Sequence, residues 1–192
     1  MNGASILKRL RSCEQGLVFI EFAICVPVLI LMVYGAVELT RFALMVQKTE
    51  DTASEITEIV VQLQASTPAT FSSEMTNVMK AVTNIMNPYT SGASDPNVWL
   101  IITDVVGNGA NNTIKWSYCG GGRGSGTTRV TASALPDGLA LVNNEEVITG
   151  EIFYRFQPIM KDILPPITLY RSLVYKPRNG ALTTALSGSN HC

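Results

Sequence analysis

Residues 16–37 read GLVFIEFAICVPVLILMVYGAV, an apolar stretch interrupted by one charged residue. The 21 residues from Leu17 to Val37 include a single acidic or basic side chain, Glu21. A helix of this length rises about 1.5 Å per residue and covers about 30 Å, which is the thickness of the hydrocarbon core of a bilayer. The sequence therefore predicts a transmembrane helix over residues 17–40.

The residues on either side of the apolar stretch predict its orientation. Lys8, Arg9 and Arg11 precede it, and only Glu14 opposes them. Because basic residues stay on the cytoplasmic side, the N-terminus is expected in the cytoplasm and the chain after about Arg41 outside it. A cleavable secretory signal would have a shorter apolar region followed by a small-x-small site, which residues 37–41 do not offer. An uncleaved signal-anchor fits the hydropathy equally well, and it remains an alternative interpretation of this helix.

Glu21 is the unusual residue of the span. A carboxylate costs roughly 2.5–3.5 kcal/mol near the bilayer centre and less near its edge. Either Glu21 lies close to the cytoplasmic interface, or a partner charge offsets it. Cleavage after Gly16 would create such a charge, the α-amino group of Leu17, and would make Glu21 the fifth residue of the mature chain. The carboxylate of one subunit could then meet the amine of its neighbour, an ion pair that fixes register more than it adds stability.

This arrangement resembles a known processing site. Gly16, four apolar residues and Glu21 are similar to the cleavage motif of type IV pilins and pseudopilins. The longer pattern, with Phe22-Ala23 after the glutamate and then Pro27 and Leu29, resembles the TadE-like proteins, the minor pilin-like proteins of tight-adherence (Tad) pilus systems. The resemblance covers about residues 8–45.

The resemblance implies a role in pilus assembly and no enzymatic activity. A prepilin peptidase would cut between Gly16 and Leu17 on the cytoplasmic side and remove a leader of residues 1–16. Because the leader holds three basic residues and one acidic residue, the net charge would change from −1 to −1 − (3 − 1) = −3. The implied partners are the inner membrane, the peptidase, other minor pilins, the major pilin and the assembly platform. The C-terminal part would be periplasmic, or extracellular within a pilus.

The rest of the chain predicts an α+β fold. Apolar residues at three- and four-residue spacing continue the first helix to about Ala65, with residues 41–66 as an amphipathic stem. Pro27 predicts a kink or a loosened turn within it. A second helix is expected from Pro68 to Asn87-Pro88, with its methionines in the core. Four strands are expected in an exported head domain of residues 67–192: Val98–Val106, Thr113–Cys119, Val147–Phe156 and Ile167–Tyr175.

Two details of the head are also expected. The alternation of Ile148, Ile152, Tyr154 and Phe156 is typical of a strand buried on one face only. The carboxylates of Glu145-Glu146, which follow two asparagines, are expected in a solvated turn.

The cysteines suggest one disulfide. Cys119 and Cys192 lie in the exported part, where an oxidising compartment favours pairing. The bond would close a loop of roughly 75 residues and stabilise the head by about 4 kcal/mol in the chain-entropy model. Cys13 would leave with the leader, and Cys25 is expected to act as a small apolar residue within the span.

Other functions find little support in the sequence. No basic surplus or nucleic-acid motif is present, so no nucleic-acid partner is expected. The glycine-rich stretch Cys119–Gly126 lacks the Lys-Ser/Thr of a phosphate-binding loop. The chain has one histidine, His191, next to its C-terminal residue, so neither a metal site nor a catalytic triad is predicted, and no cofactor is expected.

Overall fold

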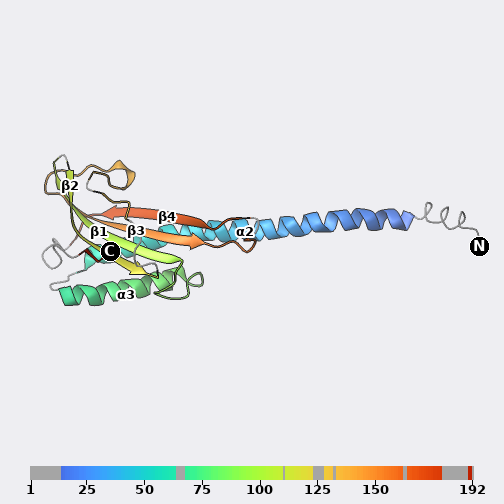
Figure 1. Cartoon of the computed structure of the whole chain (residues 1–192), viewed down its shortest axis with the longest axis horizontal. Helices are drawn as coiled ribbons and strands as arrows, with labels where there is room; N and C mark the ends of the chain where they lie inside the picture. Colours follow the sequence, from blue (N-terminus) through green and yellow to red (C-terminus); the bar gives the residue numbers. More distant parts are fainter. Residues whose placement is uncertain are drawn as a thin grey trace, which may run out of the picture. The chain divides into compact units, whose positions relative to one another are not determined.

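The computed structural model describes residues 14–63, 68–109, 111–122, 128–131, 133–161, 164–178 and 190–191. These residues form two helices, five strands and a short 3-10 turn at Pro136–Gly138. Figure 1 shows the helices and the sheet. The chain divides into two compact units between Phe42 and Ala43. The long helix α2 (Glu14–Gln62) contributes its N-terminal part to the first unit and the rest to the second.

The second unit is built on a sheet. Its strands are β1 (Val98–Asn108), β2 (Asn111–Gly121), β3 (Glu146–Phe156), β4 (Ile167–Tyr175) and the two-residue β5 (Asn190–His191). They lie in the order β4-β3-β1-β2-β5. The first four strands pair antiparallel, whereas β5 runs parallel to β2. Helices followed by this sheet confirm the predicted α+β fold.

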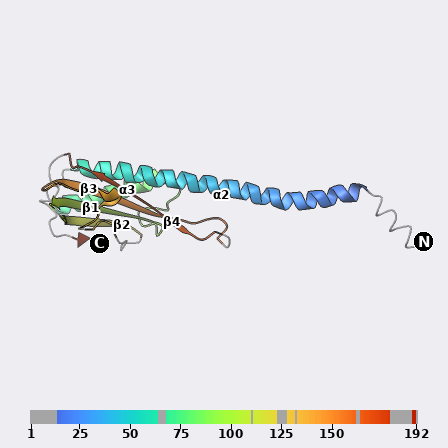
Figure 2. The same cartoon turned by 90° about the horizontal axis from the view of Figure 1, so that it is seen from above.

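Both helices of the second unit pack on the same face of the sheet (Figure 2). A Cβ atom at Gly150 on β3 would overlap the side chain of Thr57 on α2, and one at Gly120 on β2 would overlap Met79 on α3 (Pro68–Met86). Gly150 pairs with Ile102 of β1, and Gly120 pairs with Leu100, two residues from Ile102. Because alternate residues of a strand point to the same face, Gly150 and Gly120 lie on one face of the sheet. The two glycines therefore permit close approach of the helices.

The core between helices and sheet is mostly apolar. The methionines of α3 lie in the core as predicted, and the buried apolar side chains of this helix are Phe71, Met75, Val78, Met79, Val82 and Met86. Phe71 packs edge-on against Trp116 of β2, with the ring centroids 5.0 Å apart. Each buried side chain of this size contributes about 1.5–3 kcal/mol relative to exposure.

The opposite face of the sheet is covered as well. Trp99 stacks on Phe153 with centroids 4.9 Å apart, and Tyr170 packs against Phe153 at the same distance. A second cluster joins β1 and β3 to the segment that precedes β3: Val105, Val130, Leu135, Leu141 and Val147. The prediction that β3 is buried on one face only is therefore wrong. Loop residues cover the second face, and only Arg155 is exposed among residues 147–156.

Candidate assembly segment and buried polar groups

The predicted processing site lies at the start of α2. The helix begins at Glu14, so Gly16 and Leu17 belong to its first turn. The side chain of Glu21, one helical turn further on, is exposed. Pro27 lies inside the helix, which continues on both sides of it. Cleavage at Gly16, the pairing of Glu21 and a kink at Pro27 all remain predictions.

The N-terminal part of α2 presents apolar side chains on all sides. From Val18 to Val33 the large hydrophobic residues other than Val26 are at least half exposed, with Phe19 at 73%. In the described residues, α2 is the one helix long and apolar enough to cross a membrane, by length and composition. An apolar surface of this extent is rare on soluble monomeric proteins and marks a site of contact with a membrane or a partner. It fits the hydrocarbon core of a bilayer, where the backbone groups of a helix are satisfied internally.

A polar pair follows the apolar part of α2. Arg41 donates a hydrogen bond to Glu38 over 3.4 Å, one helical turn apart. This pair lies where the sequence predicts the outer boundary of the span.

The head carries a buried acidic pair that the sequence analysis did not identify. The register of β1 on β2 shifts between Asp104 and Val105, because Asp104 pairs with Trp116 and Val105 with Ile114. Lys115 is therefore the extra residue of a β-bulge. On the other side of β1, Asp104 pairs with Ile148, two residues from Glu146 on the same face of β3.

The environment of this pair changes its titration. Asp104 is fully buried. Burial and, second, the negative charge of Glu146 raise the pKa of Asp104 to about 7, against the opposing effect of Lys115. Burial also raises the pKa of the Glu146 carboxyl. The expectation of a solvated turn at Glu145-Glu146 is thus wrong for Glu146, which begins β3. Glu145 lies just before β3, where it pairs with Lys176 over 2.6 Å.

A second buried carboxylate, Glu151, lies on the opposite face of the sheet. It accepts hydrogen bonds from the hydroxyl of Tyr170 over 2.8 Å, the backbone N–H of Arg129 over 2.9 Å and the hydroxyl of Thr128. The guanidinium of Arg129 lies 4.0 Å from the centre of the Tyr170 ring. Burial raises the pKa of Tyr170 to about 12. These contacts hold residues 128–129 against the sheet. In the sequence, a glutamate inside an apolar strand was the feature that could have indicated a buried carboxylate.

Other predicted site residues are only partly described. Cys119 lies on β2, but Cys192 lies outside the described residues, so their pairing remains a prediction. The glycine-rich stretch is described only to Gly122. His191 belongs to β5, where it pairs with Tyr118. Within the described ranges, no three His, Cys, Asp or Glu side chains gather as a metal site would require.

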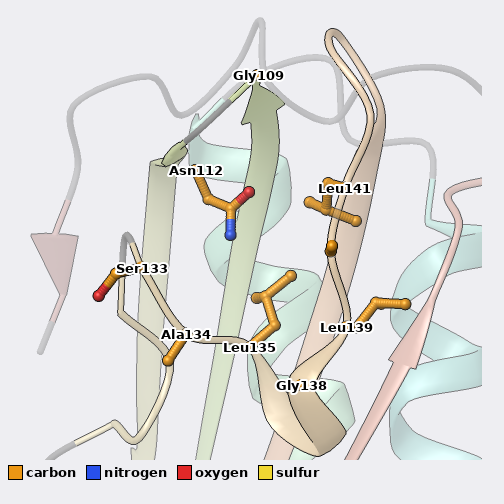
Figure 3. Close-up of a pocket in the computed structure, with 9 residues that line it drawn as sticks. Gly109, Asn112, Ser133, Ala134, Leu135, Gly138, Leu139 and Leu141 are labelled. Atoms are coloured by element: carbon orange, nitrogen blue, oxygen red, sulfur yellow. The ribbon is translucent and has the colours of Figure 1, made fainter.

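A small cavity of about 240 Å³ lies where β1 turns into β2 (Figure 3). Its lining is mostly small or aliphatic: Gly109, Asn112, Ser133, Ala134, Leu135, Gly138, Leu139, Ala140 and Leu141. Ligand pockets are usually larger and carry convergent polar groups. We assign no ligand to it.

Comparison with known proteins supports the predicted resemblance of the N-terminal segment to TadE-like proteins. Residues 16–57 match the family described as TadE-like protein. The match begins at Gly16 and confirms the resemblance that the motif indicated. No curated protein and no solved structure gives a significant match. The chain thus carries a TadE-like segment at its N-terminus, which relates it to structural components of Tad pili and to the membrane.

Proposed function

We propose that this protein is a minor pilin or pseudopilin that takes part in the assembly of a Tad-type (type IVc) pilus at the bacterial inner membrane. The observation that carries the proposal is the coincidence of the TadE-like match, residues 16–57, with the exposed apolar part of α2. A structural subunit has this design: a helix that leaves the membrane for a filament, and a head that contacts other subunits.

The proposal assigns a role to each part of the chain. Residues 1–16 form a cytoplasmic leader, which a prepilin peptidase removes between Gly16 and Leu17. Residues 17–40 span the membrane, residues 41–66 form the stem and residues 67–192 the periplasmic head. In the filament, Glu21 pairs with the new amino group of a neighbouring subunit. The exposure of Glu21 on the helix supports this role, because a carboxylate in an apolar environment needs an opposite charge nearby.

The test of processing is the N-terminal sequence of the protein in membranes of its host. Wild type should begin at Leu17 when the peptidase is present and at Met1 when it is deleted. Gly16→Ala should block cleavage, because a Cβ at the cut hinders entry of the extended backbone into a protease site. The matched control is Gly35→Ala, since a Cβ at Gly35 meets nothing within 4 Å. A wild-type protein that still begins at Met1 beside an active peptidase would contradict the proposal.

The test of assembly uses Glu21→Gln, which keeps the shape of the side chain and removes its charge. Cleavage should persist while piliation falls at least tenfold, as counted by electron microscopy. Glu55→Gln, at an exposed position of the stem, is the control and should leave piliation unchanged. Normal pili in the Glu21→Gln strain would exclude the pairing role.

The alternative is an uncleaved, signal-anchored periplasmic binding or scaffold protein, in which Glu21 lies near the interface by chance. The hydropathy of α2 fits this alternative equally well. The N-terminal sequence separates the two functions, because the alternative retains residues 1–16.

A further inference from the structure

The loop between β3 and β4 exposes apolar side chains. Ile159 is 53% exposed, Leu164 41% and Ile167, the first residue of β4, 47%. Lys161, also exposed, adds a positive charge between them. A hydrogen bond from the backbone N–H of Leu164 to the carbonyl of Met160 over 3.0 Å closes a turn within the loop. These four residues, Ile159, Lys161, Leu164 and Ile167, form what we call the apolar tip.

Contacts along β4 show at which end of the second unit the apolar tip lies. Arg171 pairs with Glu50 over 3.8 Å, and the hydroxyl of Tyr175 lies 3.2 Å from that of Ser54. Beyond β4, Arg178 pairs with Glu58 over 3.0 Å. Along these three contacts the residue numbers rise from 171 to 178 in and after β4 and from 50 to 58 in α2, so β4 runs parallel to α2. The start of β4 therefore points toward Ala43, where α2 enters the second unit.

The lengths of β4 and of α2 between these contacts place the apolar tip at that end. A strand rises about 3.3 Å per residue, so the four residues from Arg171 back to Ile167 cover about 13 Å. The helix from Glu50 back to Ala43 covers about 10 Å at 1.5 Å per residue. Ile167 therefore reaches the beginning of the second unit. In the sequence, Ala43 is only three residues from Thr40, the last residue of the proposed span.

We propose that the apolar tip rests on the membrane surface, with Ile159, Leu164 and Ile167 in the headgroup region and Lys161 among anionic phosphates. The inference depends on the proposed span at residues 17–40. The lipid surface fits better than water, because apolar side chains beside a cation are favoured at an anionic interface. The tip thus gives the head a second attachment to the bilayer besides α2, and it limits how the head turns before assembly.

The experiment measures the depth of the tip in a bilayer. Full-length protein with Cys13→Ser and Cys25→Ala is reconstituted at one copy per nanodisc of phosphatidylethanolamine and phosphatidylglycerol. Ile159→Cys is labelled with an environment-sensitive fluorophore, and spin-labelled lipids serve as quenchers. Val142→Cys is the matched control, because Val142 is 69% exposed and precedes β3, at the opposite end of that strand from the tip. Protein without an added cysteine measures any label taken by Cys119 or Cys192.

At position 159 we expect blue-shifted emission and at least threefold stronger lipid quenching than at position 142. Leu164→Cys provides a second site, should Ile159→Cys not fold. Equal quenching at the tip and control positions overturns the inference. A blue shift that needs two copies per nanodisc also overturns it, since the tip would then contact a second subunit. Failure of the span is distinguishable, because alkaline carbonate would then extract the wild-type protein from membranes.

Discussion

The ammonium group of Lys48 on α2 donates a hydrogen bond to the carbonyl oxygen of Ile85 in the last turn of α3, over 2.7 Å. A longer bond of 3.4 Å reaches the carbonyl of Asn87. The last carbonyls of a helix lack partners within it and carry a partial negative charge. Lys48 therefore supplies both a donor and a compensating charge, and it holds the end of α3 against the stem.

Replacing Lys48 by methionine should destabilise the head. Lys48→Met keeps an unbranched apolar side chain and removes the hydrogen-bond donor, so we expect the free energy of unfolding to fall by about 1–2 kcal/mol. Denaturant unfolding in detergent measures this change. Lys80→Met, at an exposed position of α3, is the control and should change stability by less than about 0.5 kcal/mol. Equal effects of the two substitutions would show that the contact contributes nothing.

Gly150 should tolerate no side chain, because α2 approaches β3 there. Any Cβ at this position meets the hydroxyl of Thr57, which is fully buried and bonded to the carbonyl of Ala53 over 2.6 Å. We expect Gly150→Val to lower the free energy of unfolding by about 1–3 kcal/mol through overpacking. Gly138→Val should not clash, since nothing lies within 4 Å of a Cβ there, although its positive φ adds strain. The decisive control is Thr57→Ala, which should restore part of the stability in the double variant.

Much of this fold was predictable, because its signals are local. The second helix, Pro68–Met86, was bounded by one proline after Thr67 and by another after Asn87. Strand β4 begins and ends as predicted, and the predicted ranges of the other three long strands lie within those observed. β5 was not predicted, because two residues carry no periodicity and pair only through the tertiary fold.

The buried polar groups were not predictable for a related reason. Asp104 and Glu146 lie 42 positions apart in the sequence and meet only through the register of β1 and β3. Likewise, Glu151 accepts a hydrogen bond from the backbone N–H of Arg129, 22 positions earlier in the sequence, and this contact forms only in the folded chain. The N-terminal site, in contrast, was read from one continuous motif, and the match to TadE-like proteins begins at the same glycine.

The acidic pair predicts a stability that falls as pH rises. The pKa of Asp104 is raised from its ordinary value of 3.8 to about 7 in the folded protein. Between these two values the folded chain binds more protons than the unfolded chain, so unfolding becomes easier with increasing pH. The decrease in the free energy of unfolding is complete above about pH 7 and is on the order of 2–4 kcal/mol. Unfolding by denaturant at pH 4.5, 6 and 8 measures it.

Asp104→Asn isolates this effect. The amide cannot ionise, so the variant should lose most of the pH dependence and should be more stable than wild type at pH 8. Asp51→Asn, at an exposed position on α2, is the control and should leave the slope unchanged. An Asp104→Asn protein with the wild-type pH profile would place the titrating group elsewhere.

The register of β5 on β2 leads to the last prediction, the disulfide between Cys119 and Cys192. Ser117 pairs with Asn190 and Tyr118 with His191, so the described part of the tail lies beside the two residues that precede Cys119. This neighbourhood supports the proposed bond. Peptide mapping without reduction should recover Cys119 and Cys192 in one linked fragment. Cys119→Ser should lower the free energy of unfolding by about 4 kcal/mol, and reductant should destabilise wild type but not the variant. Cys25→Ser controls for the loss of a thiol, because Cys25 is a free, exposed cysteine of the apolar helix. If reductant leaves wild type unchanged, the parallel pairing of β5 must hold the tail without a covalent link.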